Sequence, residues 1–139
     1  MIRYHSNVDD LAAERLVGFF VGWRTTPSPE TLLRILRQSD RAIVAIDEKT
    51  EDVIGFVTVL TDGVLTAYIP LLEVLPSYQG AGVGSELLRR AVESIRDLYA
   101  VDLTCDRGLQ PFYERHGWSR SVGMSIRRYE NQAGASADV

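Results

Sequence analysis

The sequence is poor in the residues that build covalent cross-links and metal sites. Cys105 is the single cysteine among 139 residues, which excludes an internal disulfide and any zinc site made of several cysteines. Histidine occurs only as His5 and His116, so we expect no metal site built by the protein. Lys49 is the only lysine among the 15 basic residues. A stable fold must therefore come from burial of the apolar residues, which make up 45% of the chain.

Long apolar runs are also missing. No segment approaches the roughly 20 consecutive apolar residues of a membrane span, and the first residues lack the apolar run of a signal peptide. The formal net charge of −4 gives no overall attraction to nucleic acid or to an anionic membrane. We therefore expect a cytoplasmic protein that binds neither, with a single domain over residues 1–130 and a disordered tail over 131–139.

The apolar pattern predicts helices and strands along the whole chain. Spacings of three and four predict a helix from Val8 to Trp23, and a capping hydroxyl followed by proline and an acid predicts a second helix beginning at Ser28. Pro70, inside a predicted strand, indicates a bulge or an edge position. Strands are expected over residues 2–4, 42–46, 53–60, 64–74, 101–105, 118–121 and 124–129, and further helices over 85–98 and 106–116.

Glycine gathers in one turn, Gln79-Gly80-Ala81-Gly82-Val83-Gly84, between a predicted strand and a predicted helix. Glycines let the backbone approach a ligand closely, and a helix start presents unpaired N–H groups and the positive end of the helix dipole. The turn is therefore typical of a phosphate or pyrophosphate site. It lacks the lysine of a P-loop, and Ser85 occupies the position of the third glycine in a dinucleotide fingerprint, so neither nucleotide motif applies.

In this turn the sequence resembles the GNAT acetyltransferase superfamily, whose pyrophosphate signature is Gln/Arg-x-x-Gly-x-Gly/Ala between a strand and a helix. Gln79, Gly82 and Gly84 fill the fixed positions of that signature. The order of the expected elements is also similar to the family fold across nearly the whole chain. The resemblance implies an α/β fold with a twisted mixed sheet of six to seven strands, flanked by about four helices.

A second motif, from Asp106 to Trp118, adds to the resemblance. The family typically has Asn-x-x-Ala-x-x-Phe/Leu-Tyr-x-x-x-Gly-Phe here, and Phe112, Tyr113 and Gly117 match it, with the aromatic Trp118 in the last position. Asp106 replaces the asparagine that usually contacts the pantetheine arm of the cofactor, so this contact differs in the present chain. An aspartate at this position can still cap the following helix.

The resemblance implies direct transfer of an acetyl group from acetyl-CoA to a primary amine of a small molecule or peptide, without a metal. A backbone N–H near Val74 would stabilise the tetrahedral oxyanion, and Tyr113 would protonate the leaving thiolate. A phenol, with a pKa of about 10, keeps its proton at neutral pH. Glu73 is the nearest carboxylate, and the sequence leaves open whether it is a general base, an ion-pair partner or a substrate anchor.

The resemblance also implies which residues contact each substrate. Trp23, Arg24 and Tyr68 are expected on the acceptor side, and the acetyl-CoA site is expected at Leu72, Val74, Gln79, Gly80, Ala81, Gly82, Val83, Gly84, Ser85, Asp106 and Tyr113. Two questions stay open at this point. The chain could instead be an acyl-CoA sensor or partner subunit without catalysis, and it could form a homodimer.

Overall fold

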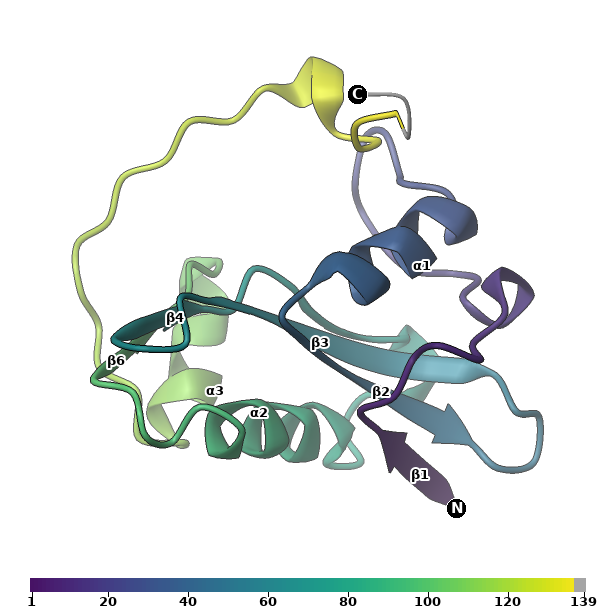
Figure 1. Ribbon diagram of the computed structural model, residues 1–139, viewed down its shortest axis with the longest axis horizontal. Helices are drawn as coiled ribbons and strands as arrows, with labels where there is room; N and C mark the ends of the chain where they lie inside the picture. Colours follow the sequence, from purple (N-terminus) through teal and green to yellow (C-terminus); the bar gives the residue numbers. More distant parts are fainter. Residues whose placement is uncertain (137–139) are drawn as a thin grey trace.

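The centre of the molecule is a twisted sheet with helices on both faces (Figure 1). A computed structural model describes residues 1–136, within which there are three α-helices: α1 (Pro29–Gln38), α2 (Val83–Glu93) and α3 (Gln110–Glu114). The six strands are β1 (Ile2–His5), β2 (Arg41–Asp47), β3 (Val53–Thr61), β4 (Thr66–Tyr68), β5 (Leu72–Val74) and β6 (Ala100–Asp102). Short 3₁₀ turns are η1 (Ala13–Arg15), η2 (Pro76–Tyr78), η3 (Arg107–Leu109) and η4 (Tyr129–Asn131).

The strands form one mixed sheet in the order β1-β2-β3-β4-β6, with β5 also paired to β3. All pairs are antiparallel except β4 and β6, which run parallel. The parallel pair needs a crossover, and α2 lies in the chain between β5 and β6 to provide it. The expected mixed sheet is therefore confirmed, with one helix fewer than the four that we expected.

The third predicted strand is divided in two at Pro70, as the proline indicated. On one side of the break Leu60 pairs with Tyr68, and on the other the Thr58 amide donates to the Leu71 carbonyl at 3.0 Å. Between these two pairs β3 spans two residues, from Leu60 to Thr58, whereas the segment opposite spans three, from Tyr68 to Leu71. The extra residue is a β-bulge, which bends the strand at this point.

Beyond this bulge the two parallel neighbours separate. The Ile69 amide donates to the Asp102 carbonyl at 3.0 Å, and no later backbone bond joins the two strands in the described part of the chain. β5 continues along β3, whereas the residues after β6 turn away toward α3. The sheet is thus open between β5 and residues 103–106, and this opening positions the site described below.

The two faces of the sheet have separate apolar cores. On one face, Leu87, Leu88 and Ala91 of α2 are at most 1% exposed and belong to a cluster with β2 and β3. On the other face, Leu32 and Leu36 of α1 are buried to the same degree. Full burial of a leucine contributes roughly 1.5–3 kcal/mol, so these helix faces hold the layers together. No helix within residues 1–136 is both long and apolar enough to cross a membrane.

The start of α1 agrees with the sequence, because the Ser28 hydroxyl accepts the Thr31 amide at 3.1 Å. The helix predicted over residues 8–23 is wrong, since this segment contains only the turn η1. Gly18 and Gly22 take φ values of 99° and 85°, which a right-handed helix cannot include. Val8, Leu16, Phe19 and Phe20 are buried in an irregular loop over the α1 face of the sheet, whereas Val17 and Val21 are exposed.

The strand pair predicted over residues 118–121 and 124–129 is also wrong. Residues 119–128 have no regular structure and form an arch that leaves the body of the molecule (Figure 1). Part of the expected tail is held instead: Gln132 accepts the Thr25 amide at 3.2 Å, and Arg34 of α1 donates to the Ala135 carbonyl. Residues 137–139 of that tail lie outside the described residues.

Candidate functional site

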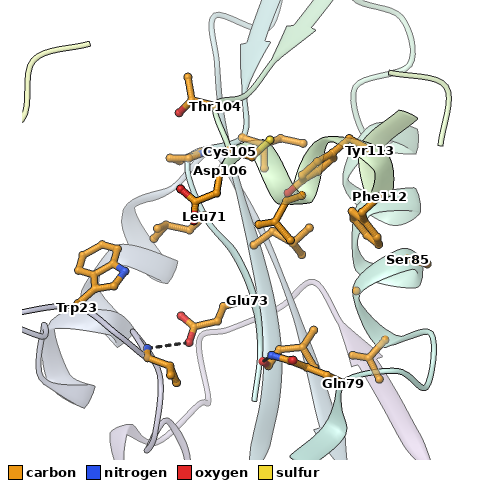
Figure 2. A pocket seen from close by; sticks show the side chains of 18 of the residues that line it. Trp23, Leu71, Glu73, Gln79, Ser85, Thr104, Cys105, Asp106, Phe112 and Tyr113 are labelled. Carbon is orange, nitrogen blue, oxygen red and sulfur yellow. Dashed lines mark hydrogen bonds between the residues drawn. The ribbon is translucent and has the colours of Figure 1, made fainter. Parts of the chain in front are cut away.

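The opening in the sheet widens into a cleft of about 1410 Å³ (Figure 2). Its walls come from β5, the glycine turn, the start of α2, residues 104–106 and α3. The loop residues Val21 and Trp23 and the segment 125–132 complete the lining. These segments are far apart in the sequence, and the separation of β5 from β6 brings them around one space.

The glycine turn presents a row of unpaired backbone N–H groups. The Gln79 amide donates to the Pro76 carbonyl at 3.3 Å and the Glu86 amide to the Gly82 carbonyl at 3.1 Å, but residues 80–85 donate to no acceptor in the described chain. Gly82, with a φ of 85°, is the residue from which α2 begins. Unpaired donors at the positive end of a helix form a binding site for an anion such as phosphate.

Side-chain bonds fix this turn to the sheet. The Gln79 side-chain amide donates to the Val74 carbonyl at 3.0 Å, so its contact is with β5. The neighbouring residue, Tyr78, donates its hydroxyl hydrogen to Asp47 at 2.5 Å. This hydrogen bond lowers the pKa of Asp47 and raises the pKa of Tyr78. The start of the turn is therefore anchored to β5 and β2 without a ligand.

The exposed edge of β5 carries backbone groups that face the cleft. The Leu75 amide donates to the Ile54 carbonyl of β3 at 2.9 Å, so these two residues form a hydrogen-bonded pair. Because such pairs alternate along antiparallel strands, the amides of Val74 and Leu72 point away from β3. Both residues line the cleft, which gives it backbone donors and acceptors on this side.

Tyr113 lies on α3, on the side of the cleft opposite β5 (Figure 2). Its ring packs at 5.0 Å from Phe112 and 5.8 Å from Trp118, both in edge-on geometry. Burial, together with nearby Cys105, raises the pKa of the phenol to about 12. In the described chain its hydroxyl has no hydrogen-bond partner, so the proton is free to be donated to a ligand.

Asp106 enters the cleft from the segment after β6 (Figure 2). The expected cap on the following helix is absent, since no side-chain hydrogen bond caps η3. The carboxylate is exposed and accepts no hydrogen bond from the described residues. Where the family pattern has an asparagine, this chain therefore places a charged group at the cleft wall.

Glu73 lies on β5 and holds the irregular loop that faces it. Its carboxylate accepts the amides of Phe20 at 2.9 Å and Val21 at 3.3 Å. Phe20 has a φ of 63°, a value that side-chain-bearing residues rarely adopt, so the two bonds stabilise a strained backbone. The next aromatic residue, Trp23, packs against the Phe20 ring in a tilted arrangement, with 4.7 Å between the ring centroids, and lines the cleft.

The two arginines in the second half of α2, Arg89 and Arg90, are already paired within the helix. Arg89 and Arg90 both approach Glu86 at 2.7 Å, and these hydrogen bonds lower the pKa of Glu86 to about 2. The positive character of the glycine turn therefore comes mainly from backbone N–H groups and the helix dipole. Within residues 1–136, no three His, Cys, Asp or Glu side chains come together as a metal site.

Most of the predicted site residues meet in this cleft, and three do not line it. Ala81 and Arg24 lie outside its lining, and Tyr68 donates to or accepts from Thr104 at 2.9 Å through its hydroxyl. The sequence missed several lining residues, which belong to irregular segments without a motif: Val21, Leu71, Thr104, Ser125, Arg127 and Tyr129. The one available signal was the alternation of apolar residues around Gly123, which we assigned to a strand pair.

Comparisons with known proteins agree with this geometry. A family model described as the acetyltransferase (GNAT) family matches residues 8–118. An uncharacterized, ycf52-like N-acetyltransferase from Prochlorococcus marinus is 31% identical over 106 residues, which cover 71% of this chain and 57% of the relative. The chain thus spans little more than half the length of that curated relative.

Solved structures extend the likeness to the whole fold. A candidate acetyltransferase from Deinococcus radiodurans R1 is 46% identical, with a TM-score of 0.95 over 98% of this chain and 94% of that one. A GNAT family protein from Streptococcus pneumoniae TIGR4 is 26% identical, with a TM-score of 0.75 over 92% of this chain and 98% of that one. The fold of this chain therefore matches that of acetyltransferase structures.

Proposed function

Because this chain belongs to the GNAT acetyltransferase family, we propose that it is an N-acetyltransferase that uses acetyl-CoA. The acetyl group passes directly to a primary amine of a small molecule or peptide, with both substrates bound together. The observation that carries the proposal is the row of unpaired amides at residues 80–85, in the same cleft as the free hydroxyl of Tyr113. An anion site and a proton donor facing one cleft suit a CoA thioester.

The residues of the cleft fit acetyl-CoA in its parts. The amides of residues 80–85 suit the diphosphate, which needs several donors and no metal. The cleft-facing backbone groups of Leu72 and Val74 suit the amide groups of the pantetheine arm, as an added strand would. Asp106 faces the same space, and we place it in contact with the far part of this arm.

The transfer forms an N–C bond and breaks the C–S bond of the thioester. The acceptor amine attacks the carbonyl carbon, and the Val74 amide stabilises the negative charge that develops on the carbonyl oxygen. When the C–S bond breaks, Tyr113 donates its proton to the CoA sulfur. A pKa of about 12 keeps this phenol protonated throughout the neutral range. Positioned proton transfer of this kind contributes roughly 10²- to 10⁴-fold to the rate.

Glu73 and Asp106 are the carboxylates that line the cleft. We propose that Glu73 shapes the acceptor side by holding Phe20 and Val21, and with them Trp23. The proton of the attacking amine can pass to Glu73 through water, because each carboxylate oxygen accepts two hydrogen bonds and only one is used. Arg24 and Tyr68 do not line the cleft. We propose that they flank the acceptor site without contacting the amine.

The proposal is tested first by calorimetric titration with acetyl-CoA, with ATP and NAD as controls. We expect binding of acetyl-CoA and no heat from NAD, because the cleft offers a diphosphate site without a dinucleotide fold. Amine acceptors are then screened by release of the CoA thiol. If acetyl-CoA does not bind to protein checked for co-purified CoA, the proposed function is overturned.

A sensor without catalysis is the competing function, and Tyr113→Phe separates the two. The variant keeps the ring and its packing but loses the proton. An enzyme then binds acetyl-CoA with nearly unchanged affinity and turns over more slowly. A sensor shows no thiol release in either protein, and its affinity for acetyl-CoA is the same in both.

A further inference from the structure

Residues 119–128, here called the arm, carry a strand pattern without a strand partner. Val122, Met124 and Ile126 alternate with small or polar residues, as in a strand with one buried face. In the structure these side chains are 100%, 98% and 77% exposed. Large apolar side chains clustered in this way on the surface mark an interaction site.

The arm cannot reach its own sheet, because both of its ends are fixed. At one end Trp118 packs on Tyr113, and its amide donates to the Tyr113 carbonyl at 3.1 Å. At the other end Gln132 accepts the Thr25 amide, and Arg34 of α1 donates to the Ala135 carbonyl. Folding the arm back onto the sheet would break these contacts.

The sheet has a matching vacancy at β6. This strand pairs with β4 on one side, and on its other side it pairs with no strand of the described chain. The exposed residues Asp102 and Asp106 give this edge a negative charge. The arm has no acidic residue; Arg120 is already paired with Glu114 at 2.9 Å, and Arg127 and Arg128 supply the remaining positive charge. An unpaired edge and a strand-like segment of opposite charge are complementary.

We propose that the arm pairs with β6 of a second copy of this chain, and that the second copy returns its arm to the first. Such an exchange is isologous, so one twofold axis closes the assembly as a dimer. Each arm then gains backbone hydrogen bonds along β6 and buries Val122, Met124 and Ile126, which explains why a strand pattern lies outside the sheet of its own chain.

The exchange also bears on the cleft. Ser125, Arg127 and Tyr129 line it, so a partner strand placed along β6 lies at the rim of the acceptor side. Turnover per chain is then expected to fall on dilution below the dimer dissociation constant. This consequence rests on the proposed function, whereas the pairing of the arms does not.

The test is the molar mass in solution, measured by light scattering and sedimentation over a range of concentrations. We expect the native chain to have the mass of two copies, and the double variant Met124→Glu with Ile126→Glu to have the mass of one. Val64→Glu is the matched control, because Val64 is 80% exposed and lies outside the arm. It is expected to leave the dimer intact. A native chain with the mass of one copy, or a double variant that stays dimeric, overturns the proposal.

A second variant guards against a general loss of structure. Ser125→Pro removes one backbone donor from the arm without adding charge, and a proline is excluded from a paired central strand. We expect Ser125→Pro to dissociate the dimer. Its monomer should have the same thermal unfolding midpoint as the monomer of the double variant. Hydrogen exchange of the arm amides gives an independent readout, with protection in the native dimer and none in either variant. Titration with acetyl-CoA in parallel separates failure of the dimer from failure of the proposed function.

Discussion

The two walls of the cleft are built in different ways. On the cofactor wall, the glycine turn leads into α2, whose buried leucines fix it to the sheet. On the acceptor wall, residues 16–23 form a loop without helix or strand, in which Gly18, Phe20 and Gly22 all have positive φ. One carboxylate on β5, that of Glu73, holds this loop through two backbone amides. The first wall rests on regular structure, and the second rests on an irregular loop held by its buried apolar residues and by the two hydrogen bonds to Glu73.

This difference indicates how one fold can keep a constant cofactor and vary its acceptor. The acetyl-CoA site that we propose at the start of α2 is preorganised, because its donors stay in place without the ligand. The exposed positions of an irregular loop, here Val17 and Val21, can change without disturbing the sheet. Substitutions on the two walls should therefore separate cofactor affinity from acceptor affinity.

The largest expected effect is that of Tyr113→Phe, at the position where the two walls face each other. We expect kcat to fall by roughly 10²- to 10⁴-fold, because the leaving thiolate loses its proton donor. The dissociation constant for acetyl-CoA should change little, since the ring packing is retained. Tyr99→Phe is the control, because Tyr99 is 85% exposed and does not line the cleft. Equal kcat values in the native protein and Tyr113→Phe would contradict the assigned role.

The pH dependence follows from the raised pKa of Tyr113. The folded-state pKa of about 12 exceeds the ordinary value of 10.0, so burial favours the protonated phenol. The associated stability is fully present below pH 10.0 and is lost as the pH rises through about 12. We therefore expect no alkaline decline of kcat due to Tyr113 below pH 10.0. A native decline in that range that disappears in Tyr113→Phe would contradict this prediction.

Glu73→Ala should act mainly on the acceptor wall. Hydrogen bonds to a charged group contribute about 1.5–3 kcal/mol. The free energy that holds the loop at Phe20 and Val21 in its bound conformation should therefore fall by up to this amount. We expect KM for the amine to rise while the dissociation constant for acetyl-CoA stays near the native value. Glu48→Ala is the control, because Glu48 is exposed and its side chain accepts no hydrogen bond from the described residues.

Glu73→Gln distinguishes the loop anchor from a general base. Glutamine keeps one of the two oxygens, so it still accepts the amide of Phe20, the shorter of the two bonds, but the side chain no longer takes a proton. If Glu73 acts mainly as the anchor, Gln recovers much of what Ala loses in KM, and kcat keeps its pH profile. A kcat as low in Glu73→Gln as in Glu73→Ala, with the KM restored, would instead identify Glu73 as the base.

Gly82→Ala should act on the cofactor wall alone. The φ of 85° at Gly82 costs an L-residue about 1–2 kcal/mol, although a Cβ there meets no atom within 4 Å. We expect weaker acetyl-CoA binding by up to about tenfold, with KM for the amine unchanged at saturating acetyl-CoA. Gly108→Ala is the control, because it also meets no atom within 4 Å but has no positive φ. Equal affinities in the two variants would show that the geometry of the turn is not required.

The sequence predicted the cofactor wall better than the acceptor wall for a physical reason. The turn at Gln79–Gly84, the α2 stripe and the bulge at Pro70 are local patterns, and each is decided by neighbours in the chain. The contact between Glu73 and the Phe20 amide joins residues 53 positions apart, and no local pattern announces it. The same spacing of apolar residues that predicted a helix over residues 8–23 instead buries a loop with interrupting glycines.

The arm shows a different limit of local patterns. The alternation of apolar and polar residues around Gly123 favours an extended strand. A strand forms only where it can pair with the edge of a sheet. No edge within the described chain is available to it, because the arm is held away from β6 at both ends. Local preference and the fold of one chain thus disagree at this place, and such disagreements are expected at interaction sites.

The smallest expected effect is that of Thr58→Val, at a buried residue of β3. Its backbone amide donates to Leu71 at the bulge, while its buried hydroxyl has no partner. Valine has nearly the same shape, so Thr58→Val keeps the packing and removes a hydroxyl that is buried without a hydrogen bond. We expect the free energy of unfolding to stay the same or to rise by about 1 kcal/mol, as measured in denaturant. If instead the variant is clearly less stable and both substrates bind more weakly, the hydroxyl supports the bulge on which both walls depend.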